Sequence, residues 1–238
     1  MPDLNFKVTG AESVPYSAAP LLNLKVQVTN AHENESIQSV MLRCQIQIET
    51  VRRQYSSEEQ AKMFELYGEP ARWGQTLRTL LWTHASIAVK PFTGSTIVDL
   101  PVPCTFDFNV ATTKYFDAIE DGEIPLCILF SGTVFYHDGD GALQVAQISW
   151  EKEANYRLPI TVWKQMMEHY YPNSAWLNIR KDVFDKLQEY KMRRSIPSWE
   201  QAFESLLMER RHPAGSQFDD ESRLDVTSGA SRQDAGVP

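Results

Sequence analysis

The stretch FYHDGDGALQV, residues 135–145, contains the acidic side chains with the closest spacing to a metal-binding loop. An EF-hand calcium loop requires oxygen ligands at positions 1, 3 and 5, glycine at position 6 and glutamate at position 12. Starting the loop at Asp138 places Ala142 at position 5, and starting two residues earlier places Gln147 at position 12. Because neither register fits, Asp-Gly-Asp-Gly instead predicts a tight hairpin turn, where both residue types tolerate positive φ. A looser calcium site, in which other loops supplement Asp138 and Asp140, stays open.

Other catalytic and cofactor motifs are missing from the sequence. The five histidines form neither HxH nor HExxH pairs, and there is no GxSxG, GxGxxG or P-loop pattern. Carboxylate pairs such as Asp117 with Glu120 are expected to be solvated charges at helix ends rather than a glycosidase pair. The sequence therefore favours a protein that is not an enzyme and that carries no cofactor or metal.

The segment RRQYSSEEQAKMFELYGEPARWGQTLR, residues 52–78, is a candidate protein-binding surface. It gathers arginine, tyrosine and tryptophan, the residue types that are enriched at interface hot spots. Alternatively, its aromatic residues close the open end of a β-sandwich. The motif YYPNSAWL, residues 170–177, adds the two aromatic candidates Tyr171 and Trp176. The candidate interaction residues are Arg52, Arg53, Arg72, Trp73, Tyr171 and Trp176.

Charge and composition restrict the class of partner. The net charge is −8, and Asp and Glu outnumber Lys and Arg by 31 to 23. Such a surface disfavours nucleic acid and anionic membranes. No apolar run reaches the roughly 18 residues that a membrane helix needs, and MPDLNFKVTG lacks the features of a signal peptide. We therefore expect a cytoplasmic protein, with Cys44, Cys104 and Cys127 buried and reduced because they lie in strand-like runs without CxxC spacing.

Alternating hydrophobicity dominates the first 150 residues. In VMLRCQIQI, residues 40–48, apolar side chains occupy every second position, as in a strand with one buried face. The segment 22–28 repeats the pattern, and 104–110 is one of several further candidates. About eight short strands separated by turn residues predict an antiparallel β-sandwich, so the fold class is mainly β with α.

Helices are expected at several places. Within residues 57–67 an insertion begins at Ser57, a plausible N-cap with Gln60 at the capping-box position. The segment 112–119 predicts a helical turn with its aromatic residues facing inward. After Trp150 the period changes to about 3.5, which predicts three amphipathic helices.

The expected domain organisation therefore has three parts. They are a sandwich at 1–157, a helical region at 158–210 that packs on the sandwich or on a partner, and a tail at 211–238. The tail is poor in large apolar residues and is expected to be disordered.

The segments HDGDGALQVAQISWEKEANYRLPITVW and MMEHYYPNSAWLNI resemble a family of uncharacterised bacterial proteins of just over two hundred residues, classed as a domain of unknown function. The resemblance covers roughly residues 1–208. It implies no catalytic residue or cofactor. It does imply a setting, because genes of this family accompany those of oxygen-tolerant nickel-iron uptake hydrogenases, which suggests an accessory or assembly protein.

Two functions remain open from the sequence. The first is a non-catalytic interaction or accessory protein that binds a protein partner, with self-association also open. The second is a small-molecule or glycan-binding sandwich, which could be an enzyme, using aromatic residues and carboxylates at the sandwich mouth.

Overall fold

The computed structural model of the chain describes residues 1–105, 110–175 and 177–211. They divide into two compact units, Met1–Trp176 and Leu177–Pro238, which are treated separately below. The expected strand at 104–110 and the expected tail at 211–238 lie largely outside the described residues.

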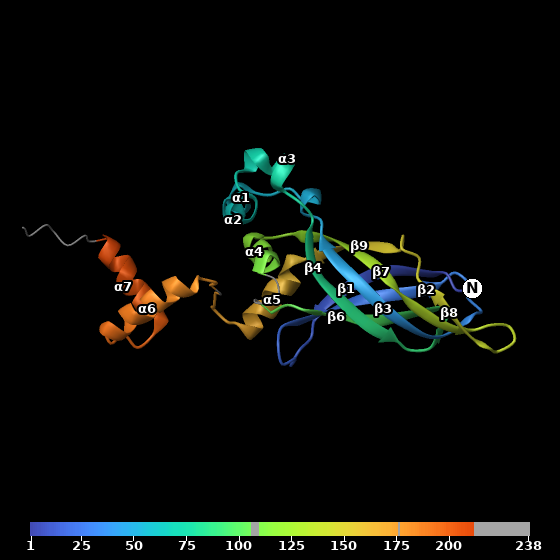
Figure 1. Ribbon diagram of the computed structural model, residues 1–238. Helices are drawn as coiled ribbons and strands as arrows, with labels where there is room; N and C mark the ends of the chain where they lie inside the picture. Colours follow the sequence, from blue (N-terminus) through green and yellow to red (C-terminus); the bar gives the residue numbers. More distant parts are fainter. Residues whose placement is uncertain (106–109, 176, 212–238) are drawn as a thin grey trace, which may run out of the picture. The chain divides into compact units, whose positions relative to one another are not determined.

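The first unit is built on two antiparallel sheets (Figure 1). The smaller sheet has the order β1 (Leu4–Ser13), β2 (Leu21–Asn30) and β6 (Ser95–Pro103). In the larger sheet, β3 and β7 form the centre, β4 and β5 pair with β3, and β8 and β9 pair with β7. Its strands are β3 (Ser36–Ile48), β4 (Leu80–Val89), β5 (Phe92–Thr93), β7 (Glu123–His137), β8 (Leu143–Gln147) and β9 (Glu153–Pro159). The prediction of a mainly antiparallel β-sandwich is confirmed.

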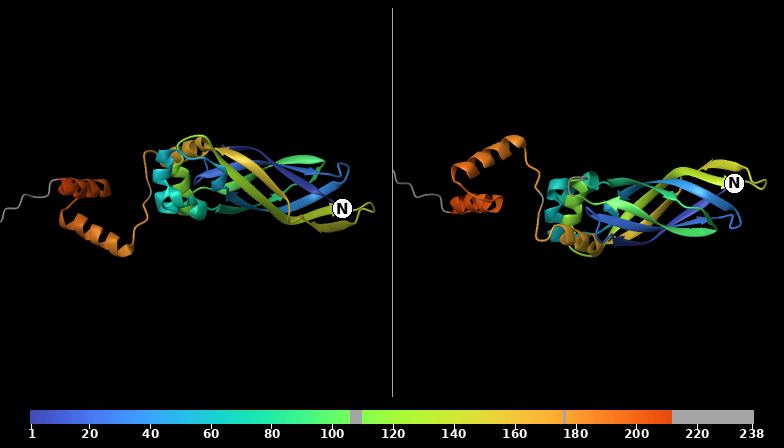
Figure 2. Two further views of the ribbon diagram at one scale, coloured as in Figure 1. Left: turned by 90° about the horizontal axis from the view of Figure 1, so that it is seen from above. Right: turned by 90° about the horizontal axis from the view of Figure 1, so that it is seen from below.

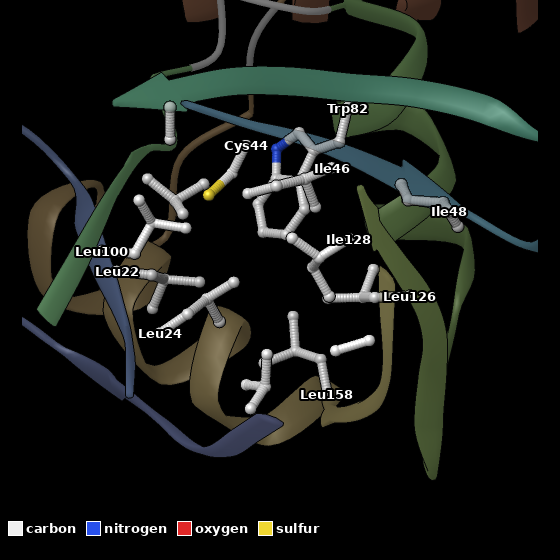
Figure 3. Packing of buried hydrophobic residues seen from close by; sticks show 14 of the residues in the cluster. Leu22, Leu24, Cys44, Ile46, Ile48, Trp82, Leu100, Leu126, Ile128 and Leu158 are labelled. Atoms are coloured by element: carbon white, nitrogen blue, oxygen red, sulfur yellow. The ribbon is translucent and has the colours of Figure 1, made fainter. Parts of the chain in front are cut away.

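The alternating residues of the sequence form the core between the sheets (Figure 3). Leu22 and Leu24 of β2 face Ile46 of β3, and all three side chains are fully buried. Phe6 of β1 stacks on Phe130 of β7 with ring centroids 4.3 Å apart, which joins the two sheets directly. At the seams, β1 lies beside β9 and β4 lies beside β6. The two sheets therefore close around one hydrophobic interior, which is the main stabilising contribution in such a fold.

One glycine allows the two central strands to approach closely. Gly132 of β7 pairs with Leu42 of β3 and has a φ of +143°, a backbone conformation that side chains rarely permit. A Cβ atom there would lie 2.0 Å from the carbonyl oxygen of Met41. Any other residue at position 132 would therefore separate β3 from β7 or change the backbone conformation there.

Helices gather at one end of the sandwich (Figure 2). Phe116 of α4 stacks on Trp163 of α5 at 5.0 Å and meets Trp82 of β4 edge to face at 4.9 Å, so the helices are anchored on the sheets. As predicted, Tyr115, Phe116 and Ile119 are buried. The helical elements of this unit are η1 (Thr50–Arg52), α1 (Ser57–Lys62), α2 (Phe64–Tyr67), η2 (Pro70–Arg72), α3 (Trp73–Thr76), α4 (Val110–Ala118) and α5 (Ile160–Tyr170).

The predicted N-cap of α1 is displaced by one residue. The Ser56 hydroxyl accepts the Glu59 N–H at 3.1 Å, and the Glu59 carboxylate accepts the Ser56 N–H at 3.0 Å, so the capping box is Ser56–Glu59. The assignment to Ser57 and Gln60 was wrong. The sequence offers two possible capping boxes, Ser56 with Glu59 and Ser57 with Gln60. The first one forms because the Glu59 carboxylate also binds Arg53 and the Glu120 N–H. Gln60 instead donates to the Tyr55 carbonyl.

The second unit contains the helices α6 (Lys181–Arg193) and α7 (Trp199–Arg211). Ser198 caps α7 as predicted, because its hydroxyl accepts the Gln201 N–H at 3.2 Å. The helix α5, which the sequence assigned to the helical region, belongs to the first unit, where Trp163, Met166 and Met167 are buried.

Candidate interaction surfaces

A buried ion pair ties the arginine-rich segment to the sandwich end. Arg53 Nη2 donates to Glu59 Oε1 at 2.8 Å, and the two side chains are only 13% and 5% exposed. The same nitrogen donates to the Asp121 carbonyl at 2.6 Å, and Glu59 Oε1 also accepts the Glu120 N–H at 3.0 Å. These added hydrogen bonds offset part of the desolvation of both charges, although the buried Arg53 Nε has no hydrogen-bond partner among the described residues. Arg53 thus holds α1 against the residues that follow α4.

A cluster of hydroxyl groups lies beneath the same helices. The Tyr55 hydroxyl donates to the Thr50 carbonyl at 2.6 Å and lies 2.9 Å from the Tyr115 hydroxyl. Burial raises the pKa of both phenols above its ordinary value. Both groups are therefore neutral hydrogen-bonding partners, and they fasten the connection between β3 and β4 to α4.

The two other arginine candidates, Arg52 and Arg72, are exposed to solvent. Arg52 is 59% exposed and pairs with Glu49 at 2.8 Å, close to Asn155 of β9. Arg72 is exposed at the end of η2. The structure therefore separates the candidate arginines, with one enclosed and two accessible.

The aromatic candidates are partly enclosed. Trp73 donates from its indole N–H to the Gly68 carbonyl at 3.1 Å and meets Tyr55 edge to face at 5.5 Å. Tyr171 is half-buried against the core beside α5. Trp176 lies outside the described residues. Segment 52–73 thus covers the end of the sandwich, in agreement with the alternative interpretation, with Arg72 on its outer side.

The carboxylates at the C-terminal end of α4, Asp117 and Glu120, lie among lysines. Glu120 pairs with Lys62 at 2.7 Å, and this hydrogen bond holds the pKa of the Glu120 carboxyl below its ordinary value. Asp117 lines a pocket of about 210 Å³ together with Lys62 and Lys114. Desolvation raises the pKa of the Asp117 carboxyl, although Lys164 lowers it in part. The pKa of each carboxyl group is thus shifted by its own surroundings and not by the other carboxylate.

The opposite end of the sandwich has an open polar groove of about 660 Å³. It lies between the turn His32–Ser36 and the tip of the β7–β8 hairpin, and it is lined by His137, Asp138 and Gly139 on the hairpin side. The Asp138 carboxylate accepts the Asp140 and Ala142 N–H groups at 3.1 and 2.9 Å. The predicted hairpin turn is therefore confirmed, and Asp138 Oδ1 is engaged in closing it.

The α6–α7 hairpin presents apolar side chains that its own two helices do not cover. Phe184 meets Trp199 with ring centroids 5.2 Å apart, yet it remains 38% exposed. Leu207 and Met208 of α7 are 64% and 66% exposed. Ala202 is the only buried residue among the described side chains of this unit.

A second apolar surface was missed in the sequence. Leu143 and Val145 of β8 are 58% and 57% exposed, and Trp150 in the following turn is 91% exposed. Alternation in ALQVAQ indicated a strand, but it could not show that β8 lies at the edge of its sheet. The sequence also extended this strand over 142–150, whereas β8 ends at Gln147 and Trp150 lies in the turn before β9.

Within the described parts of the chain, no three His, Cys, Asp or Glu side chains come together in an arrangement that could hold a metal ion. No described helix is long and apolar enough to span a membrane. Burial raises the pKa of the Cys44 and Cys104 thiols to about 12, so both are inert at neutral pH.

These features define a β-sandwich closed at one end by helices, with a short helical hairpin as a second unit. The chain belongs to the family of unknown function DUF6084, whose family model matches residues 1–215. No curated protein matches the chain.

Two solved structures resemble it distantly. The solution structure of a candidate late embryogenesis abundant (LEA) protein is 14% identical, with 67% of this chain and 73% of that chain covered and a TM-score of 0.28. The crystal structure of a candidate ApaA protein from Bordetella pertussis is 13% identical, with 66% and 93% covered and a TM-score of 0.22.

Proposed function

We propose that this protein is a non-catalytic interaction module whose α6–α7 hairpin binds a protein partner. The observation that supports the proposal is the apolar surface that this hairpin leaves exposed, which includes Phe184, Leu207 and Met208. Two 13-residue helices whose described side chains include a single buried residue lack the apolar burial that usually stabilises helices of this length. A partner that covers the face would supply it.

The side chains indicate what kind of surface the hairpin fits. Met192 and Met208 are exposed and have flexible, unbranched side chains that suit an irregular apolar groove, and Leu207 adds a third exposed apolar side chain. Around them α6 carries four basic and three acidic residues, whereas residues 199–209 of α7 contain three glutamates and no basic residue. We infer a partner with an apolar groove that has a basic rim on the side that faces α7.

The experiment is affinity capture by the tagged full-length chain from its native host. The captured protein is then purified, and its binding to the wild type and to two variants is measured directly. We expect Leu207→Glu together with Met208→Glu to weaken binding by at least about a hundredfold, since buried apolar anchors contribute about 2 kcal/mol or more each. The matched control is Ile97→Glu, which places the same charge at a 60% exposed strand position and should bind normally. Equal binding by the wild type and the hairpin variant would overturn the proposal.

The partner that the family resemblance implies is a component of a nickel-iron uptake hydrogenase or of its assembly machinery. The identity of the captured protein tests this narrower statement separately. A hydrogenase component supports it. An unrelated protein that still requires Leu207 and Met208 refutes the hydrogenase assignment and leaves the interaction function standing.

The alternative function, small-molecule or glycan binding, would use the open groove between the turn His32–Ser36 and the β7–β8 hairpin. Glycan sites use aromatic platforms beside carboxylates. The described residues that line this groove include no tryptophan, tyrosine or phenylalanine. Stabilisation of the protein by a sugar or metabolite, abolished by Asp138→Ala, would favour this alternative.

A further inference from the structure

The strand β8 has a free edge in the larger sheet. It pairs with β7 on one side, and no strand in the described part of the chain occupies its other side. The remaining long edges of the two sheets lie at the seams, where β9 meets β1 and β4 meets β6. In Figures 1 and 2 the β7–β8 hairpin projects at the end of the sandwich opposite the helices.

The hydrogen-bond pattern shows which backbone groups this edge presents. Asp138 N–H donates to the Ala142 carbonyl and Ile148 N–H donates to the Gly132 carbonyl, each at 3.0 Å. Bonded pairs alternate along an antiparallel ladder, so the intervening bonded residues of β8 are 144 and 146. The N–H and C=O groups of Leu143, Val145 and Gln147 therefore point away from β7.

The edge also lacks the devices that usually protect one. Exposed edges in soluble proteins commonly carry lysine, proline or a bulge. β8 reads LQVAQ, without a charge or a proline, and its pairing with β7 is regular. Leu143 and Val145 stand exposed on its outer face, beside the row that contains Phe135 of β7. The strand is thus an accessible template for pairing.

We propose that β8 pairs with β8 of a second copy of this chain, antiparallel and centred on Val145. The proposal does not depend on the function of the α6–α7 hairpin. A two-fold axis at Val145 places Val145 opposite Val145 and Leu143 opposite Gln147 of the other copy. In this register each residue whose N–H and C=O point away from β7 lies opposite such a residue of the other copy. All three outward N–H groups and all three outward C=O groups of each strand are therefore hydrogen-bonded.

Charge favours the second copy over a parallel arrangement or a charged peptide. The strand is neutral, so no like charges meet along it. The antiparallel register keeps the acidic hairpin tips of the two copies, each carrying Asp138 and Asp140, at opposite ends of the paired strands. Beside Gln147, a cavity of about 280 Å³ bordered by Met1–Leu4 leaves this end of the edge accessible.

The size of the contact sets the expected affinity. Stable interfaces bury about 1,200–2,000 Å², and a five-residue strand with its neighbouring apolar side chains lies at the low end. We therefore expect a dimer that dissociates on dilution, as sedimentation equilibrium of the full chain would show.

The variant Val145→Lys tests the pairing. Two lysines would oppose each other at the axis, and dimerisation should weaken at least about tenfold. Val145→Thr, which keeps a β-branched neutral side chain, should dimerise like the wild type. Ile97→Lys, at a 60% exposed strand position elsewhere, should also dimerise normally. A wild-type monomer at every concentration, or a Val145→Lys dimer of unchanged affinity, would overturn the proposal.

Crosslinking tests the register. In the proposed pairing the two Cα atoms at position 145 lie about 5.5 Å apart, so Val145→Cys should crosslink efficiently with a short bismaleimide. The three native cysteines are buried and give little background. Ile97→Cys is the control for random collision, and crosslinking at 97 equal to that at 145 would count against the proposal.

A dimer that is lost in the Leu207→Glu and Met208→Glu variant but kept in Val145→Lys would show that the hairpin mediates self-association. That result would refute β8 pairing without testing capture of a different partner by the hairpin.

Discussion

Arg53 and Glu59 form an ion pair at 2.8 Å that the helical end of the sandwich encloses almost completely. Their bond connects the residue after η1 to the first turn of α1. Through the Asp121 carbonyl and the Glu120 N–H, it also connects both to the chain beyond α4. An arginine whose sequence context predicted partner contact is therefore committed to holding the fold.

Replacing Glu59 by alanine should lower the free energy of unfolding by about 3–5 kcal/mol, because it leaves the Arg53 guanidinium buried without its counter-charge. The matched control is Glu65→Ala, which removes an ion pair with Lys114 whose side chains are 73% and 41% exposed. An exposed pair contributes less than about 1 kcal/mol. Urea unfolding of both variants measures the difference, and similar losses would mean that the Arg53–Glu59 pair has no special role.

The two adjacent serines before α1 should differ in their effect on stability. Ser56→Ala removes the acceptor for the Glu59 N–H and should cost about 0.5–2 kcal/mol. Ser57→Ala alters an exposed first-turn position and should change stability by less than about 0.5 kcal/mol. Thermal unfolding of the two variants side by side distinguishes the caps, because an N-cap at Ser57 would give the opposite order.

Alkaline pH should destabilise the fold through its buried phenols and thiols. Burial raises the pKa of Tyr67 from 10.0 to about 12 and those of Cys44 and Cys104 from 9.0 to about 12. Above those ordinary values the unfolded chain has released protons that the folded chain still holds. Stability must then fall as pH rises through this range. Unfolding free energies should change little near neutral pH and should decline once the pH exceeds 9.0.

The variant Tyr115→Phe measures how much the Tyr55–Tyr115 hydroxyl pair contributes to the loss of stability at alkaline pH. At neutral pH it should cost about 1 kcal/mol, because the Tyr55 hydroxyl loses its partner at 2.9 Å. The decline in alkali should become shallower, since burial raises the pKa of Tyr115 as well. Tyr16→Phe, at a 95% exposed position, should leave both quantities unchanged. An unchanged slope in Tyr115→Phe would contradict this account.

The strands could be predicted because their signal is local. Each residue of 40–48 shows in its own neighbourhood whether it faces the core, since burial of one face imposes a period of two. The inward turn of Arg53 could not be predicted in this way. It depends on backbone groups at 120 and 121, more than sixty positions along the chain, and no pattern near Arg53 indicates them.

The two candidate surfaces also differ in whether local sequence or distant contacts determine them. The amphipathic pattern of α7 predicts an apolar face from the sequence alone, and Leu207, a member of that face, is 64% exposed. The exposed edge of β8 follows from strand order, which is set by distant pairings. An isolated segment such as LQVAQ has the same pattern in the middle of a sheet as at its edge.

Gly132 offers a sharp test of the packing between the two central strands. Alanine at this position would bring a Cβ to 2.0 Å from the Met41 carbonyl oxygen in a backbone with φ of +143°, so the strands must separate or the residue must change conformation. We expect a loss above about 4 kcal/mol, or failure to fold, because steric overlap and backbone strain act together.

Gly139→Ala is the matched control. A Cβ at position 139 would meet no described atom within 4 Å, and the cost of this substitution should stay near 0.5 kcal/mol or less, as is typical of surface positions, where changes are about that size. Soluble yield and urea unfolding report both outcomes, and a stable Gly132→Ala protein would show that β3 and β7 do not approach as closely as the register Leu42–Gly132 requires.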